Sequence, residues 1–428
     1  MRRLTFGLVL LLMLASTLAG ADTPAAARGG MPQQISRASF VGMVVRDPFY
    51  EFGSDPANPA ATNAAFQDEM GRMLAMAGVQ WVRLEIHLGD DVQGDLAKHD
   101  YFINTVAPRH GFKVLALLAF DVVRDRNLWD LNCLQAECMV GGSKYGGGVN
   151  SFMQQWLDRS LMVADRYGSR IAAYEVLNEQ NRLPPSGLGI EPTITGRLMT
   201  KFYRFCHGIG TPAGESHGCG QSQIVLGGLH PRGTGDPTKP STIKLTDAQY
   251  LAAIYSDPSS FASFYKSYGY YPLDGVGYHP YPEEVRLSLP RQVYVDTGIQ
   301  RMLKVLDAYD PSKPLWITEI GYNLAFAGND PSQLGAFVRD IYTTLAQQPR
   351  IANVFWFKYE DFAPAEGSNA QKWGMVRIPF TADASRPDGV RYQAQGQPAE
   401  VRTTFSVLRE LTGTPLFPAR AYLPMVAR

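Results

Sequence analysis

Two glutamates stand where a carboxylate could do chemistry. Glu179 ends the segment 174–179, Tyr-Glu-Val-Leu-Asn-Glu, and Glu319 ends the apolar run 315–319, Leu-Trp-Ile-Thr-Glu. Two carboxylates on separate strands are the minimum apparatus for glycoside hydrolysis: one protonates the leaving oxygen, and the other attacks the anomeric carbon or activates water. Their separation sets the stereochemistry, about 5–5.5 Å for retention and about 6.5–9.5 Å for inversion. A lone Glu beside a strand is usually a surface or capping residue, but the pair favours catalysis.

Other polar side chains follow or lie within similar apolar runs. A histidine such as His279 is more often a satisfied core residue, but Tyr281 two positions later favours a pair that orients Glu319. Glu175 has the parity of a residue inside the predicted barrel, where a carboxylate must be paired. We expect Glu175 to be a structural partner of Arg83.

Eight short apolar runs alternate with longer segments of helical pattern. The runs are rich in β-branched and aromatic residues and are bounded by Gly, Pro or charged residues, which predicts strands. The predicted strands are 40–45, 79–86, 112–119, 171–177, 224–229, 275–279, 315–320 and 354–357. Helical patterns occupy 63–77, 152–167, 292–309, 331–347 and 398–411. Asp330 is the expected N-cap of the fourth of these helices.

These alternations predict an α/β fold of the (β/α)8 barrel type, as a single domain with long βα loops. A doubly wound sheet usually carries a glycine-rich phosphate-binding turn after its first strand, whereas Arg46, Asp47 and Pro48 follow here. Since barrel active sites lie at the C-terminal strand ends, the polar residues should converge at one mouth. Five loop aromatics are expected either to flank that mouth or to anchor loops: Trp129, Tyr145, Tyr359, Phe362 and Trp373.

Charge and the first residues indicate the compartment. Lys+Arg and Asp+Glu number 40 each, so no basic surface points to nucleic acid. Arg2 and Arg3, an apolar run and a small-residue site before residue 22 are typical of a secretory signal peptide, 1–21, whose cleavage leaves a formal charge of −2. An uncleaved anchor is the alternative. We expect a secreted monomer that is free of the membrane after cleavage. The rest of the chain divides into a flexible segment 22–36, a catalytic barrel 37–412 and a C-terminal tail 413–428.

The four cysteines are even in number, which in an exported chain favours disulfides. Proximity in sequence pairs Cys133 with Cys138 and Cys206 with Cys219. Their spacings fit no common zinc-ligand pattern. The seven histidines are scattered, which disfavours a metal-dependent barrel hydrolase. We expect neither a metal nor an organic cofactor.

The strand endings resemble those of glycoside hydrolase clan A, the retaining (β/α)8 hydrolases. The segment 174–179 resembles the clan's aromatic-Glu-x-x-Asn-Glu ending of strand four. The resemblance makes Glu179 the acid/base and Asn178 the residue that holds the sugar 2-hydroxyl. The segment 315–321 resembles the seventh-strand segment that ends in the nucleophile, which is Glu319 here.

Further positions extend the resemblance over residues 40–411. Arg83 matches the arginine of the clan's second strand, and Trp356 matches the eighth-strand tryptophan under the bound sugar. His279 and Tyr281 resemble a His-x-Tyr pair whose tyrosine hydrogen-bonds the nucleophile. The nearest likeness is to family 39 and cellulase-like family 5. Two positions depart from the pattern, where many relatives have Trp and Pro: Leu177 and Gln180.

The resemblance implies hydrolysis of a β-linked polysaccharide or oligosaccharide with retention, through a glycosyl-enzyme on Glu319. The pKa of Glu179 should be raised while Glu319 is anionic. Long loops after the third, fifth and eighth strands favour an endo-acting, cellulase-like enzyme with carbohydrate as its partner. An exo-acting β-glycosidase or transglycosylase and a non-catalytic carbohydrate-binding barrel remain alternatives.

Overall fold

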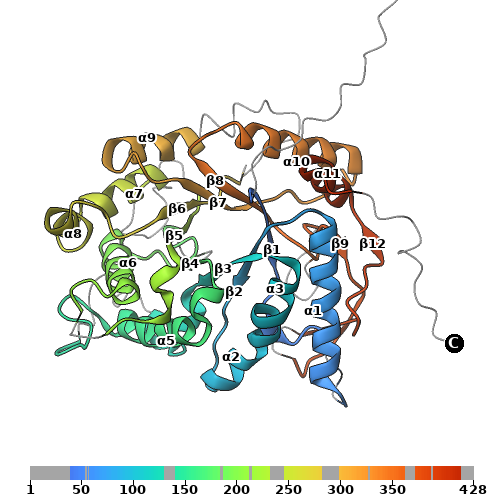
Figure 1. Ribbon diagram of the computed structural model, residues 1–428, viewed down its shortest axis with the longest axis horizontal. Coiled ribbons are helices and arrows are strands. Elements are labelled where there is room, and N and C mark those ends of the chain that lie inside the picture. Colours follow the sequence, from blue (N-terminus) through green and yellow to red (C-terminus); the bar gives the residue numbers. More distant parts are fainter. Residues whose placement is uncertain are drawn as a thin grey trace, which may run out of the picture. The chain divides into compact units, whose positions relative to one another are not determined.

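Eight short parallel strands close into one barrel, and helices surround it (Figure 1). The computed structural model describes residues 39–53, 55, 57–129, 140–183, 187–211, 215–231, 245–281, 298–325, 328–361, 372–386 and 389–415. The strands are β1 (Val41–Val45), β2 (Trp81–Glu85), β3 (Lys113–Leu118), β4 (Ala173–Val176), β5 (Gln223–Leu229), β6 (Gly275–Tyr278), β7 (Leu315–Ile320) and β8 (Ile351–Trp356). Pairing of β1 with β8 closes the sheet. The eight predicted strands and the (β/α)8 fold are confirmed.

The strands read as nearly continuous apolar runs because both faces of the sheet are covered. Alternate residues point to opposite faces. One set forms a small cluster enclosed by the strands: Val44, Trp81, Leu115, Ala173, Val225, Trp316 and Phe355. The other set joins the larger core between the sheet and the helices.

Helices occupy the predicted patterns 63–77, 152–167, 292–309 and 331–347, and further helices lie between the other strands. They are α1 (Pro59–Met76), α2 (Val92–Tyr101), α3 (Ala107–His110), α5 (Ser151–Tyr167), α6 (Pro192–His207), α7 (Asp247–Ser256), α8 (Phe261–Tyr268), α9 (Gln300–Tyr309), α10 (Pro331–Ala346) and α11 (Thr403–Thr412). Asp330 caps α10 as predicted, because its carboxylate accepts from the Ser332 amide. The first residues of the predicted helix 292–309 lie outside the described residues.

The predicted last helix, about 398–411, is present but begins five residues later than expected, at Thr403. Residues Glu400–Val401 form β12, which pairs antiparallel with β9 (Val376–Arg377), and α11 begins only after it. A second ribbon pairs β10 (Phe380–Ala382) with β11 (Val390–Tyr392). Strands of two or three residues are too short to show a periodicity, so these ribbons are not predictable from local pattern.

One disulfide, Cys206–Cys219, joins the end of α6 to the turn before β5 and confirms that pairing. Cys133 and Cys138 lie outside the described residues. So do the predicted signal peptide, the segment 22–36 and residues 416–428. Within the described part of the chain, no helix combines the length and the apolar character needed to cross a membrane.

Candidate active site

The backbone turns sharply where β4 ends. Leu177 and Glu179 both have positive φ, 69° and 45°, a region that residues other than glycine rarely adopt. A hydrogen bond of 2.9 Å from the Glu179 amide to the Gly228 carbonyl ties this turn to β5. Gly228 must lack a side chain, because a Cβ there would lie 2.0 Å from Nε2 of His279. Backbone strain of this kind concentrates at functional sites.

Arg83 links three of the predicted residues at the barrel mouth. Its Nε donates to Glu175 Oε2 at 2.5 Å, and its other two nitrogens donate to Glu319 Oε1 at 2.5 Å and Asn178 Oδ1 at 2.8 Å. Glu175 is fully buried and also accepts from the Gly228 amide at 2.9 Å. The predicted pairing of Glu175 with Arg83 is therefore present. The fork of one guanidinium fixes the carboxylates of two different strands relative to each other.

The Glu319 carboxylate is nearly buried and held at both oxygens. Arg83 contacts Oε1, and the Tyr281 hydroxyl donates to Oε2 at 2.9 Å. Burial, then the charge of Glu319, raises the pKa of Tyr281 well above its ordinary value, so this hydroxyl stays protonated as a donor. His279 Nδ1 lies 3.7 Å from the same oxygen. These contacts fix the orientation of the Glu319 carboxylate.

Glu179 meets a different set of partners. His279 Nδ1 lies 3.2 Å and His230 Nδ1 3.4 Å from Oε1, while Arg182 donates to Oε2 at 2.7 Å. Burial alone would raise the pKa of Glu179, but hydrogen bonds from His230 and His279 outweigh it and lower the pKa below its usual range. The raised pKa expected from sequence is not found in this arrangement.

The two glutamates face each other. Glu179, His279 and Glu319 each present a polar atom, and these atoms all lie within 4.8 Å of one another. The nearest approach of the two carboxylates is therefore below the separation of about 6.5–9.5 Å that inverting enzymes need for an intervening water. Such a triad could also ligate a metal, but here Arg83 and Arg182 already neutralise the carboxylates.

Trp356 is not brought to this cluster, contrary to expectation. Its ring is fully buried and packs against Phe337 of α10, with centroids 6.1 Å apart. The next residue, Phe357, faces the site instead: its ring lies 6.2 Å from Tyr281 and 6.0 Å from Trp373. The reason is the twofold alternation of the strand, which sends neighbouring residues to opposite faces.

The loop aromatics divide between the site and the scaffold. Trp373 reaches the site, where its ring lies 6.0 Å from that of Tyr281. Tyr145 anchors its loop, because its hydroxyl donates to Asp158 of α5 at 2.6 Å. Tyr359 is fully buried in the large core. The side chain of Trp129 and the whole of Phe362 lie outside the described residues.

A second group of ionisable residues lies at the ends of β1, β2 and β3. Glu85, His87 and Asp121 each offer a ligand atom within 4.8 Å of the others, a geometry that could hold a cation. Burial, then the charges of Asp121 and Asp47, raises the pKa of Glu85 to about 8. At neutral pH the Glu85 carboxyl is therefore largely protonated. Asp47 is also close to His99, whose Nε2 lies 2.6 Å from Asp47 Oδ1.

Sequence reasoning missed His230 and Arg182. His230 directly follows the apolar run of β5, so the strand-end criterion that selected the other residues would have selected it. Arg182 depends on the turn after Glu179, whose positive φ no local pattern indicates. No role is predicted for Glu85 from the sequence.

Comparison with known proteins finds one family model and solved structures that share the fold. Residues 288–377 match the family described as "Glycosyl hydrolase catalytic core". No curated protein sequence matches the chain. Among solved structures, a β-glucosidase from Thermotoga maritima in complex with castanospermine is 13% identical, with a TM-score of 0.55, over 89% of this chain and 99% of the other.

Two further structures share the fold. A GH5_18 enzyme from Bifidobacterium longum, in complex with Manβ1-4GlcNAc, is 12% identical over 90% of this chain and 79% of the other, with a TM-score of 0.53. A family 39 glycoside hydrolase from Bacteroides cellulosilyticus is 12% identical, with a TM-score of 0.52. That match covers 88% of this chain, which spans only 64% of the length of the family 39 enzyme.

Proposed function

We propose, from the premise that this chain is a glycosyl hydrolase with a (β/α)8 barrel, that it cleaves β-linked glycans with retention. In this proposal Glu319 is the nucleophile and Glu179 the acid/base. The observation that carries it is the approach of the two carboxylates to within 4.8 Å at one mouth. A gap of this size leaves room for direct attack on the anomeric carbon rather than for an intervening water.

The partners of each glutamate support its role. An oxygen of Glu319 forms a bond to the anomeric carbon while the bond from that carbon to the leaving oxygen breaks, and the leaving oxygen takes the proton of Glu179. Glu179 then removes a proton from water, which attacks the anomeric carbon and releases Glu319. Arg83 and Tyr281 hold the two oxygens of Glu319 in a fixed orientation before attack.

Glu179 must gain a proton before it can act as an acid. The histidine contacts that lower its pKa therefore have to weaken when substrate binds. Arg182 is 39% exposed and can move aside as the leaving sugar enters. In this proposal Asn178, held by Arg83, contacts the sugar 2-hydroxyl, and Phe357 with Trp373 forms an apolar wall beside Tyr281.

The mode and place of action form part of the proposal. The long connections after β3, β5 and β8 favour an endo-acting enzyme, although the β-glucosidase of the same fold makes exo action the natural competitor. The predicted signal peptide and the Cys206–Cys219 bridge support an extracellular location. Hydrolysis tests on β-glucan, xylan, mannan and arabinan, with sizing of the products, would identify the substrate and distinguish the two modes.

The role assignment is tested by rescue of two variants with azide. Glu319→Ala should abolish turnover of an activated aryl β-glycoside, and azide should restore it with an inverted product. Glu179→Ala should form the glycosyl-enzyme but hydrolyse it slowly, so azide should give a retained β-glycosyl azide. Glu215→Ala, on an exposed side chain, is the control and should keep full activity.

Products of the opposite stereochemistry would reverse the two roles. Full activity of either variant would reject the mechanism at these residues. A wild-type protein that binds glycans but cleaves none of them would instead identify a non-catalytic carbohydrate-binding barrel.

A further inference from the structure

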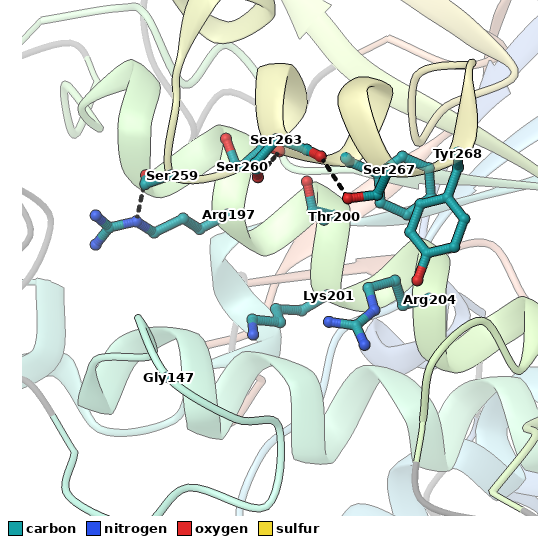
Figure 2. Close-up of a pocket in the computed structure, with 11 residues that line it drawn as sticks. Gly147, Arg197, Thr200, Lys201, Arg204, Ser259, Ser260, Ser263, Ser267 and Tyr268 are labelled. Carbon is teal, nitrogen blue, oxygen red and sulfur yellow. Dashed lines mark hydrogen bonds between the residues drawn. The ribbon is translucent and has the colours of Figure 1, made fainter.

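A hollow of about 200 Å³ lies on the outer flank of the barrel between α6 and α8 (Figure 2). It shares no residue with the site at the mouth. Arg197, Lys201 and Arg204 of α6 line one wall, because positions four and three residues apart fall on one helix face. Serines of α8 and the ring of Tyr268 line the other wall.

The hollow is strongly cationic. Among the described residues, no carboxylate lines it. Arg197 donates to the Ser259 hydroxyl at 2.8 Å, and Arg204 donates to the backbone carbonyls of Ile209 and Gly210. In the described part of the chain, no hydrogen bond or ion pair engages the Lys201 ammonium. The three positive charges are therefore not neutralised by any residue of the lining.

Lys201 carries the clearest sign of this imbalance. Burial, followed by the charges of Arg204 and Arg197, lowers the pKa of its ammonium. The carboxylate behind the wall, Asp257, is engaged by the hydroxyls of Ser259 and Ser260 and does not line the hollow. An anion entering the hollow would relieve the repulsion among the three cations.

One exposed aromatic ring, that of Tyr268, lines the hollow, and two further exposed tyrosines come from the same part of the chain. Tyr265, Tyr268 and Tyr270 are 46%, 43% and 39% exposed, and they are three of the five large hydrophobic side chains exposed in the described residues. Tyr268 lies 6.4 Å from Tyr270 and 4.5 Å from Phe264 between ring centroids. Clustered exposed aromatics mark binding surfaces, since each ring offers an apolar face beside a polar hydroxyl.

We propose that this flank is a second carbohydrate-binding site, which takes a negatively charged sugar unit of an acidic polysaccharide. The carboxylate or sulfate of that unit would bind Arg197 and Lys201, and a sugar ring would lie against Tyr268. The site goes beyond the catalytic function proposed above, because it would hold a polymer to the enzyme without cleaving it. Binding at the flank and cleavage at the mouth can therefore be measured separately.

The test compares binding by the full chain of polygalacturonate, dextran sulfate, unmodified dextran, inorganic sulfate and double-stranded DNA. Arg197→Gln combined with Lys201→Gln should weaken binding of the acidic glycans by about tenfold or more, the effect of losing charge-assisted hydrogen bonds. Lys304→Gln combined with Arg377→Gln removes the same charge from exposed residues elsewhere and should change little. Tyr268→Ala should weaken binding of the glycans but not of sulfate.

Thermal unfolding shows whether the Arg197→Gln, Lys201→Gln variant is folded. Because the substitutions remove like charges, its unfolding midpoint should be unchanged or higher. The proposal is overturned if this variant binds acidic glycans as the wild type does, or if dextran binds as tightly as they do. It is also overturned if DNA binds equally well and Tyr268→Ala has no effect, since the flank would then attract any polyanion. Each flank variant should cleave a neutral substrate at the same rate as the wild type.

Discussion

At the barrel mouth one arginine serves three acceptors, whereas on the flank between α6 and α8 three cations face hydroxyls and backbone carbonyls. Arg83 is 2% exposed, and each of its three guanidinium nitrogens donates a hydrogen bond to a side-chain oxygen. Lys201, by contrast, has no such partner in the described residues. A compensated buried charge fixes geometry in advance of the reaction. An uncompensated, accessible charge is suited to a ligand that brings its own counter-charge.

The same substitution, arginine to methionine, at the mouth and on the flank tests this difference most directly. Arg83→Met leaves Glu175 buried without its cation, which should lower the free energy of unfolding by about 3–5 kcal/mol and abolish turnover. Arg197→Met, on the flank, should change stability by only about 0.5 kcal/mol and leave turnover intact. Urea unfolding measures the first effect and initial rates the second. Similar losses for both variants would mean that the mouth is no more dependent on its arginine than the flank.

A smaller effect is expected from matched tyrosine substitutions. Tyr281→Phe removes a hydrogen bond to the charged Glu319 carboxylate, a contribution of about 1.5–3 kcal/mol. If that bond acts in the transition state, kcat on an aryl glycoside should fall by roughly tenfold to a hundredfold. Tyr268→Phe keeps its ring on the flank and should leave kcat unchanged. An unaltered kcat for Tyr281→Phe would show that the hydroxyl only fills space.

The mouth and its scaffold differ in how far the sequence predicts them. The strands are predictable because burial on both faces makes each one a short apolar run, and the strand-end rule then selects Glu179 and Glu319. Trp356 was misplaced because adjacent aromatics end β8, and the register of β7 against β8 shifts near this point. Only the paired structure decides which of the two rings, that of Trp356 or that of Phe357, faces inward.

Electrostatic properties are harder still to predict from sequence. The lowered pKa of Glu179 depends on His230 and His279, which come from two other strand ends. The flank cations share one helix face, a pattern that usually marks an ordinary solvated surface. What distinguishes the flank is the absence of carboxylates from the hollow's lining among the described residues, and that follows from tertiary packing.

The smallest expected effect concerns Glu85, a half-buried carboxyl whose pKa is raised by burial and by the charges of Asp121 and Asp47, which together outweigh the opposing charge of Arg83. Its pKa in the folded protein is about 8, against 4.5 for the ordinary group, so the folded state binds more protons than the unfolded state between these values. The free energy of unfolding should therefore decline as pH rises through this window and level off above it. Glu85→Gln removes that contribution, so its stability should decline less than that of the wild type from about pH 5 to 8. Urea unfolding at several pH values measures the slopes, with Glu215→Gln as the exposed control, and parallel curves for Glu85→Gln and the wild type would show that Glu85 is already solvated.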